Sequence, residues 1–214
     1  KQKEVLFMTK LKYIEKALLI GFVIAILFSF TSFTAFAAQC EQIPNEVFRL
    51  HVLANSDSEE DQALKLKVRD RLLDETGTLF SECTTKEEAM SAAKANIAYL
   101  EQVAQDEIYK QGYTYGVTVE VENIFFNNRQ YDDITMPAGN YDALRVLIGE
   151  GAGQNWWCVL FPAMCLPAAE KREGMPELDD VLTDEQMSAV EGNQYEVKFK
   201  TVEIYESIKS WFGW

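Results

Sequence analysis

The sequence has 214 residues but only one histidine, His51, and it contains no C-x-x-C pair. Zinc sites use closely spaced cysteine and histidine ligands, so both absences argue against a zinc centre. The sequence also lacks the G-x-S-x-G motif that presents a serine nucleophile. We therefore expect no metal, no cofactor and no catalytic residue, and we do not expect an enzyme.

Three glycines, Gly149, Gly151 and Gly153, stand at alternate positions without the motif of a nucleotide-binding loop. Dinucleotide sites need the spacing G-x-G-x-x-G, and phosphate-binding loops need a following Lys-Ser/Thr pair. The next segment has the pattern of a strand, so no helix N-terminus is available for an anion. The glycines instead predict a chain reversal with positive φ angles.

Basic residues are scarce: 20 Lys and Arg stand against 34 Asp and Glu, and the net charge is −14. Residues 1–37 hold five of the basic and two of the acidic residues, which leaves 15 and 32 in the remainder, a net charge of −17. A surface of this sign repels phosphate backbones and anionic lipid headgroups. We expect no nucleic-acid partner, and the ordinary interpretation of the excess is solubility.

The N-terminus has the pattern of an export signal. Five lysines lie within Lys1–Lys16, residues 17–36 carry no charge, and Ala35-Phe36-Ala37 is an A-x-A motif. We interpret residues 1–37 as a signal peptide cut after Ala37 or Ala38. The alternative is an uncleaved signal anchor, because the apolar run approaches the roughly 20 residues that span a bilayer. Either version places the remainder outside the cytoplasm, and only an uncleaved leader would hold it to a membrane.

The four cysteines, Cys40, Cys83, Cys158 and Cys165, all follow the leader. An even number in an exported chain permits disulfides. We predict the pair Cys158–Cys165. The alternative is that these two residues are buried thiols that pack as small hydrophobic side chains.

Alternation of apolar and polar residues predicts strands at residues 47–54 and 113–125, the second half-exposed. It also predicts a core hairpin of residues 144–148 and 156–161, reversed at the glycines. A polar loop is expected at residues 129–140. Trp156 and Trp157 are consecutive on a strand, so we expect one to enter the core and the other to be available to a partner.

Helices are predicted after a capping box of Ser56 and Glu59, ending near Gly77, and again from Thr85 to Gly112. A short helix capped by Thr183 is expected at residues 183–190. Residues 167–180 are expected to form a mobile loop, residues 195–199 a last short strand and residues 201–214 an amphipathic helix.

Strands and helices are grouped along the chain and do not alternate regularly. This order predicts an α+β fold, with an antiparallel sheet of about four strands and helices mainly on one face. We expect a single exported domain at residues 38–214. Its core covers residues 45–166, and residues 167–214 form a C-terminal loop and helix.

Two patterns are compatible with catalysis, but neither is specific evidence for it. His51 would pair with Cys158 as a thiol nucleophile, or with an aspartate to activate a serine, yet Cys158 lies in an apolar run where a thiol loses its reactivity. Paired acids such as Asp132-Asp133 would suit a secreted cell-wall hydrolase, which is our alternative function. A structural or partner-contacting His51 is the simpler interpretation.

Two segments carry a family resemblance: FRLHVLANSDSEEDQALKLKVRDRLL at residues 48–73 and PAGNYDALRVLIGEGAGQNWWCVLFPAMC at residues 137–165. Together with the leader they resemble the stage II sporulation protein R family of endospore-forming bacteria. The resemblance covers nearly the whole chain and implies export from the forespore into the intermembrane space of the sporulation septum. There the protein would be a signalling ligand without catalytic residues of its own.

The resemblance also implies a partner: a membrane-embedded aspartic protease of the mother-cell septal membrane, which removes the pro-sequence of the early mother-cell sigma factor. We expect this chain to activate that protease. A third option, an anchored structural protein, would require an intact leader. The candidate partner-binding residues lie in or beside the two matching segments: Arg49, His51, Asn55, Asp57, Arg145, Asn155 and Trp156.

Overall fold

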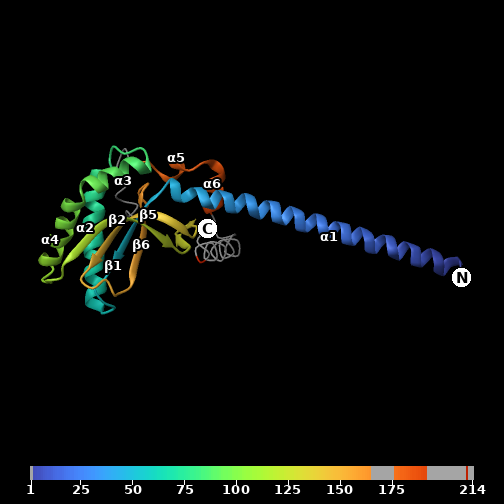
Figure 1. Cartoon of the computed structure of the whole chain (residues 1–214), viewed down its shortest axis with the longest axis horizontal. Coiled ribbons are helices and arrows are strands. Elements are labelled where there is room, and N and C mark those ends of the chain that lie inside the picture. The colour runs from blue at the N-terminus through green and yellow to red at the C-terminus, as the bar shows by residue number, and fades with distance from the viewer. Residues whose placement is uncertain (1, 165–175, 192–210, 212–214) are drawn as a thin grey trace. The chain divides into compact units, whose positions relative to one another are not determined.

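The computed structural model describes residues 2–164, 176–191 and 211, with side chains described from Lys12 onward except at Phe30. The chain forms two units, Lys1–Gln39 and Cys40–Trp214 (Figure 1). The elements are α1 (Gln2–Gln42), η1 (Ile43–Asn45), β1 (Phe48–Leu53), α2 (Glu59–Leu79), α3 (Lys86–Ala95), α4 (Ile97–Lys110), β2 (Val117–Phe126), β3 (Arg129–Tyr131), β4 (Ile134–Met136), β5 (Gly139–Ile148), β6 (Asn155–Phe161), α5 (Leu178–Val181) and α6 (Asp184–Val190).

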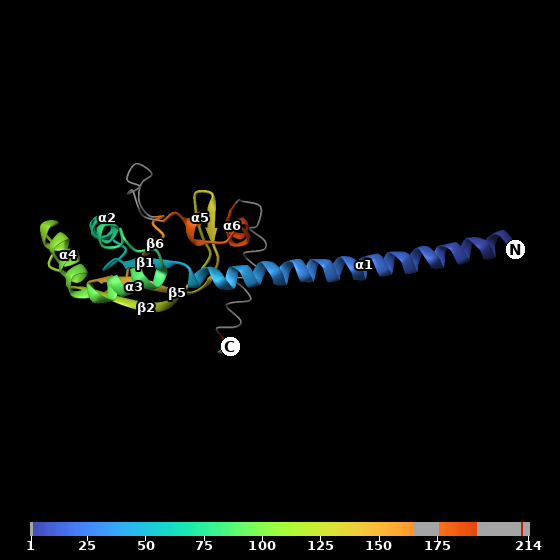
Figure 2. The ribbon, with the colours of Figure 1, turned by 90° about the horizontal axis from the view of Figure 1, so that it is seen from above.

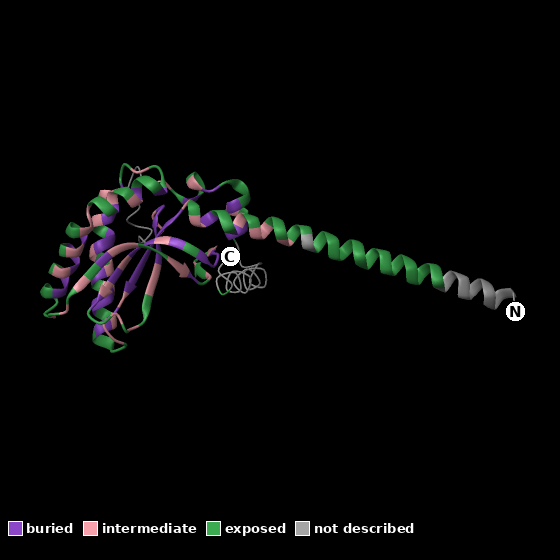
Figure 3. Ribbon diagram, in the orientation of Figure 1, coloured by how far each residue is buried: buried purple, intermediate pink, exposed green. Residues whose placement is uncertain are grey.

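The first unit consists of α1 residues. The helical stretch Lys12–Asn45 has a mean hydropathy of 2.2 in its most apolar window and is long and apolar enough to cross a membrane, by length and composition. Its described residues before the second unit are largely exposed (Figure 3). The helix continues through Ala37 and Ala38, and whether the leader is cut there stays a prediction.

The second unit is a mixed α/β fold around a four-stranded sheet with strand order β2-β5-β1-β6 (Figure 2). The pairs β2–β5 and β1–β6 are antiparallel, and β1–β5 is parallel. The predicted α+β class is therefore confirmed. The small β3–β4 hairpin forms a second sheet within residues 129–140, where a polar loop was predicted.

The predicted core hairpin is wrong, because β1 lies between β5 and β6. Strand β6 occurs where it was predicted, and β5 contains the predicted residues 144–148 but begins at Gly139, within the predicted loop. The two strands do not pair with each other. Their ends are separated by two strand spacings, about 10 Å, which a tight turn does not span. The loop 149–154 instead crosses the end of β1. Gly149 and Gly151 do take positive φ angles, +57° and +60°.

Alternate residues of each strand face a core that α2, α3 and α4 cover. Phe48, Leu50 and Val52 of β1 pack there with Leu64 and Val68 of α2. Figure 3 shows that the buried residues concentrate in the strands and along the helices beside them. Helices α2 and α4 contact each other on this side of the sheet.

Helix boundaries follow capping chemistry. Thr85 and Glu88 form the predicted capping box of α3, and Thr183 and Gln186 form that of α6. Helix α2 begins two residues later than predicted, because Ser58, not Ser56, accepts from the Asp61 amide. The predicted helix from Thr85 to Gly112 is broken at Asn96, which donates from its side chain to the Ala92 carbonyl and separates α3 from α4.

Part of the predicted C-terminal region has no structural test. Residues 165–175 and 192–210 lie outside the described residues, as do the strand predicted at 195–199 and most of the helix predicted at 201–214. Helix α5 occupies the end of the predicted loop 167–180.

Candidate functional site: the second face of the sheet

The sheet face opposite α2–α4 has two different ends. One end carries a second hydrophobic core, in which η1, the β3–β4 hairpin, α5 and α6 cover the strands. Its buried members are Ile43, Val47, Phe126, Met136, Tyr141, Ala143, Val159, Leu178, Leu182 and Val190. The helices are thus not confined to one face, since α5 and α6 contribute to this second layer.

At the other end two rows of side chains run across all four strands. The strand register aligns Thr118, Leu147, Leu53 and Asn155 in one row and Glu120, Arg145, His51 and Trp157 in the next. Among these residues His51 is buried, and the rest are exposed or half-buried. We call these eight residues, together with Glu122, the exposed sheet end.

Arg145 holds two carboxylates at the β2 side of the exposed sheet end. Its Nη1 donates to Glu120 Oε1 at 3.2 Å and to Glu122 Oε2 at 2.8 Å. Both glutamate side chains stay accessible to solvent, at 45% and 44% exposure. Pairs this exposed contribute little to stability, because water screens them. The two glutamates matter mainly for the negative charge that they place on this surface.

His51 is held in a fixed position on β1. Its ring stacks on Trp157 with the centroids 3.8 Å apart and the planes 7° apart. His51 Nε2 lies 2.7 Å from Asn155 Oδ1, an atom that only accepts, so Nε2 carries the proton of the neutral ring. Burial lowers the pKa of His51, although the Asn155 hydrogen bond opposes this effect. The ring is therefore neutral at pH 7, and its buried Nδ1 has no hydrogen-bond partner among the described residues.

Arg49 is fully buried, unlike the other candidates on this face. Its guanidinium carbon lies 4.1 Å from the ring centre of Phe126 and 4.8 Å from that of Tyr141. Arg49 Nη2 donates to the Tyr131 hydroxyl at 2.6 Å, and that hydroxyl donates to the Trp157 carbonyl at 3.0 Å. Arg49 therefore ties the β3–β4 hairpin to the sheet.

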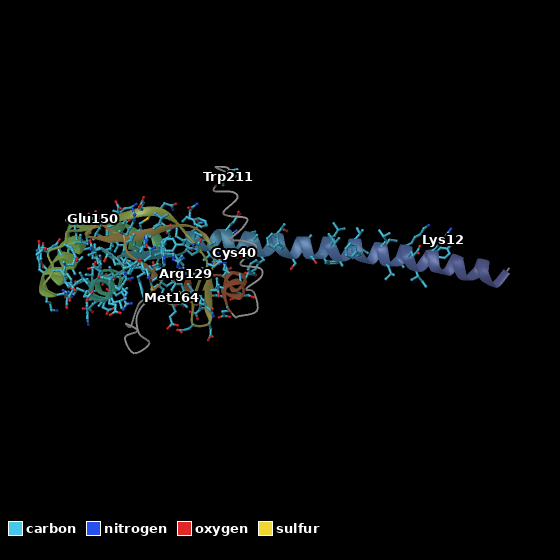
Figure 4. All side chains as sticks on the ribbon, turned by 90° about the horizontal axis from the view of Figure 1, so that it is seen from below. Lys12, Cys40, Arg129, Glu150, Met164 and Trp211 are labelled. Atoms are coloured by element: carbon cyan, nitrogen blue, oxygen red, sulfur yellow. The ribbon has the colours of Figure 1, made fainter. Side chains whose placement is uncertain are left out.

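Asn55 and Asp57 lie in a different place, at the junction of the β1–α2 loop with loop 149–154 (Glu150 of this loop is labelled in Figure 4). Asn55 accepts from the Glu150 amide at 3.0 Å, and Asp57 accepts from the Gln154 amide at 2.7 Å. A Cβ at Gly153 would lie 2.5 Å from the Ser56 carbonyl carbon and closer still to its oxygen. The glycines thus permit close approach of two backbones.

Asp61 anchors this loop junction from the first turn of α2. It is 4% exposed and accepts from Asn55 Nδ2 at 2.8 Å and from Ser56 Oγ at 2.6 Å. Burial acts to raise the pKa of Asp61, but the hydrogen bonds from Ser56, Asn55 and Tyr115 outweigh burial and lower it. Asn55 and Asp57 therefore help to hold the two loops together.

Trp156 points to the α2–α4 side, where the Arg69 guanidinium carbon lies 4.1 Å from its ring centre. Trp157 packs against the second core on the opposite face. Both tryptophans are half-buried, so neither is simply a core residue or a free surface residue. The alternation was predicted correctly, and each tryptophan packs partly against the core on its own face of the sheet.

Cys158 is disulfide-bonded, whereas Cys83 is a free thiol. Cys165, the predicted partner of Cys158, lies outside the described residues, so the pairing stays a prediction. A disulfide at Cys158 removes the thiol that a Cys158–His51 nucleophilic pair would need. Burial raises the pKa of the Cys83 thiol, and Glu88 and Glu82 raise it further. Within the described ranges, no group of three or more His, Cys, Asp or Glu is placed to hold a metal ion.

Comparison with known proteins identifies the family of this chain. The model of the stage II sporulation protein R family matches residues 44–171, more than half of the chain. The chain belongs to this family. A curated relative, stage II sporulation protein R of Bacillus subtilis (strain 168), is 36% identical over 138 residues, which are 64% of this chain and 62% of the relative. The chain thus aligns with less than two thirds of that protein's length. No solved structure matches.

The family match runs from η1 through β6, so it includes the whole four-stranded sheet, the loop junction and the exposed sheet end. Of the predicted contact residues, the structure brings His51, Arg145 and Asn155 together there. Sequence reasoning missed Glu120, Glu122 and Trp157 as their neighbours. The alternation of β2 does mark both glutamates as outward-facing, but the register that sets them beside Arg145 is not visible in the sequence.

Proposed function

We propose that this chain is an exported ligand that activates a membrane-embedded aspartic protease during endospore formation. Membership of the stage II sporulation protein R family supports a role in sporulation and is the observation that carries the proposal. The proposed consequence of activation is cleavage of the pro-form of the early mother-cell sigma factor. In this scheme the protease makes the chemical step, and the chain supplies recognition.

The N-terminal helix supports export. A helix with this length and hydropathy near the N-terminus is compatible with a signal peptide, and its lysine-rich flank would stay on the cytoplasmic side. The proposed destination of the second unit is the intermembrane space of the sporulation septum. In that place the domain would face the outward surface of a receptor in the mother-cell membrane.

The proposed mechanism is a shift between receptor conformations. An aspartic protease needs two aspartates close together, so a receptor that assembles as a dimer is active only in its assembled state. A ligand that binds the assembled state more tightly favours it by the difference in binding free energy. A shift from mostly inactive to mostly active, 1:99 to 99:1, requires about 5.5 kcal/mol of differential affinity.

The side chains of the second unit are consistent with recognition. His51 is fixed by a stack and a hydrogen bond, Cys158 is in a disulfide, and the acids of the exposed sheet end are paired with Arg145. A recognition surface needs groups that are already held in place, because ordering them on binding costs free energy.

The test is reconstitution in a bacterial host that does not sporulate. The receptor protease and the pro-sigma factor are expressed with or without the full chain, and immunoblotting follows conversion of the pro-factor. We expect conversion when the chain is present and none when it is withheld. Equal conversion in both cultures would refute the proposal.

A second culture identifies which protein cleaves. It carries a receptor in which one active-site aspartate is replaced by asparagine, together with the wild-type chain. We expect no conversion there, because the chain supplies no catalytic group. Conversion by the inactive receptor, or release of glycan fragments from cell walls by the purified chain, would support the alternative of a secreted hydrolase.

A further inference from the structure

The exposed sheet end has the composition of a protein-binding surface. Leu53 and Leu147 lie on its two central strands and Trp157 on the edge strand β6, all half-buried, and the polar residues Thr118 and Asn155 lie at the two edges. Interfaces between proteins combine an apolar centre that includes aromatic residues with a polar rim. A sheet face of this kind offers side chains in fixed positions, because each is set by the strand register.

The charge on this surface is asymmetric. Glu120 and Glu122 share a single cation, Arg145, at the β2 side, so one negative charge is left over. His51, the next residue in the row, is neutral because burial lowers its pKa. Arg129 of β3 (labelled in Figure 4) lies at the β6 side, with its guanidinium carbon 6.0 Å from the Trp157 ring centre. The excess negative charge is therefore local to β2.

Two neighbouring side chains in the same row have buried polar atoms without a hydrogen-bond partner in the described part of the chain. They are Arg145 Nε and His51 Nδ1, on adjacent strands. His51 is 5% exposed. Leaving a buried polar group without a hydrogen bond costs free energy, and most such groups in folded proteins have partners. Among the described residues, hydrogen bonding in this row is therefore incomplete.

We propose that the exposed sheet end docks a protein segment that presents a lysine or arginine side chain beside an aliphatic or aromatic one. The cation would bind Glu120 and Glu122, and the apolar side chain would pack on Leu53, Leu147 and Trp157. The inference rests on the proposed function, since the segment would belong to the outward face of the receptor protease.

Charge favours this occupant over two others. A second copy of the chain carries the same negative charge of −17 outside its leader, so association of two copies would bring like charges together. A membrane surface with anionic headgroups is repelled for the same reason. A basic segment of a different protein is attracted by the surplus carboxylate and gains further from the apolar side chains.

The first experiment uses the reconstituted host and the full chain. The double variant Glu120→Gln/Glu122→Gln removes both charges and preserves side-chain size. Its matched control, Glu87→Gln/Asp106→Asn, removes two charges from exposed positions of α3 and α4, on the other side of the sheet. At levels of the chain that give half-maximal conversion, we expect the first variant to lower conversion about tenfold. The control should convert as the wild type does.

The outcomes separate the inference from the proposed function. No conversion with the wild-type chain refutes the proposed function. Conversion by the wild type and by both double variants to the same extent overturns the inference alone. Immunoblots of the exported chain show whether a variant accumulates to the wild-type level.

A second experiment keeps the inference testable if the glutamine variant fails to accumulate. A photoreactive amino acid is placed at Thr118 of the exposed sheet end or, as the control, at Tyr99 of α4, which is 48% exposed. We expect irradiation to join the chain to the receptor from position 118 and not from position 99. A receptor adduct from position 99 alone, or an adduct from position 118 with a second copy or with lipid, would overturn the docking surface proposed here.

Discussion

The contact between loop 149–154 and the β1–α2 loop makes a specific prediction for Gly153→Ala. The added methyl group would lie 2.5 Å from the Ser56 carbonyl carbon and 3.0 Å from the Ala54 Cβ. Backbone atoms cannot swing aside as a flexible side chain can, so the two loops must separate. The movement strains hydrogen bonds from the Gly153 amide to the Ala54 carbonyl, 2.9 Å, and from the Gln154 amide to Asp57, 2.7 Å.

Two effects set the magnitude of this change. Overpacking a well-packed site costs about 1–3 kcal/mol, and each weakened hydrogen bond adds about 1 kcal/mol. Alanine recovers about 0.4–1 kcal/mol by restricting the unfolded chain. We expect Gly153→Ala to lower the free energy of unfolding by about 2–4 kcal/mol.

The assay is urea unfolding of the full chain in detergent, followed by tryptophan fluorescence. Gly116→Ala is the matched control, because a Cβ there meets no atom within 4 Å. We expect the control to be neutral or to gain up to about 1 kcal/mol. If Gly153→Ala unfolds at the same urea concentration as Gly116→Ala, the two loops are not in the close contact that the structure shows.

Three further predictions follow from the caps, the histidine and the disulfide. Thr85→Ala removes the capping box of α3 and should lower the free energy of unfolding by about 1 kcal/mol; no change in the urea midpoint would contradict the role of the cap. Burial lowers the folded-state pKa of His51 below 6.5, so the unfolded chain binds the proton more readily, and stability should fall as the pH drops from 7.5 to 5.5. His51→Gln should lack this loss in urea titrations at the two pH values, and an unchanged loss would assign it to other groups. Mass spectrometry of an unreduced digest should show Cys158 joined to Cys165, and a Cys158 peptide joined to Cys40 or Cys83 would disprove that pairing.

The local patterns of the sequence were sufficient to locate the four strands of the main sheet and most caps, but not the β3–β4 hairpin. The alternation around Phe48, Leu50 and Val52 reports which side of β1 is buried, and Thr85 with Glu88 marks the start of α3, because both signals depend on residues close in the chain. The break at Asn96 was missed, because the apolar stripe of the helix continues past it.

Strand order was not predictable in the same way. Segments 144–148 and 156–161 with glycines between them are the pattern of a hairpin, yet β1 enters between them from nearly 100 residues earlier in the chain. The arrangement of the candidate site was not predictable for the same reason. His51, Arg145 and Asn155 were chosen individually, but Glu120 becomes their neighbour only through pairing of β2 with β5, which no local pattern specifies.

The central place of β1 bears on the order of folding events in the proposed export of the chain. In the proposed export, residues 48–53 would cross the membrane well before their pairing partners, residues 143–147 and 155–161, which follow about 90 or more residues later in the chain. Long-range pairing of this kind is slow. The four-stranded sheet can therefore be completed only after residue 161 has crossed, when about three quarters of the chain is on the far side.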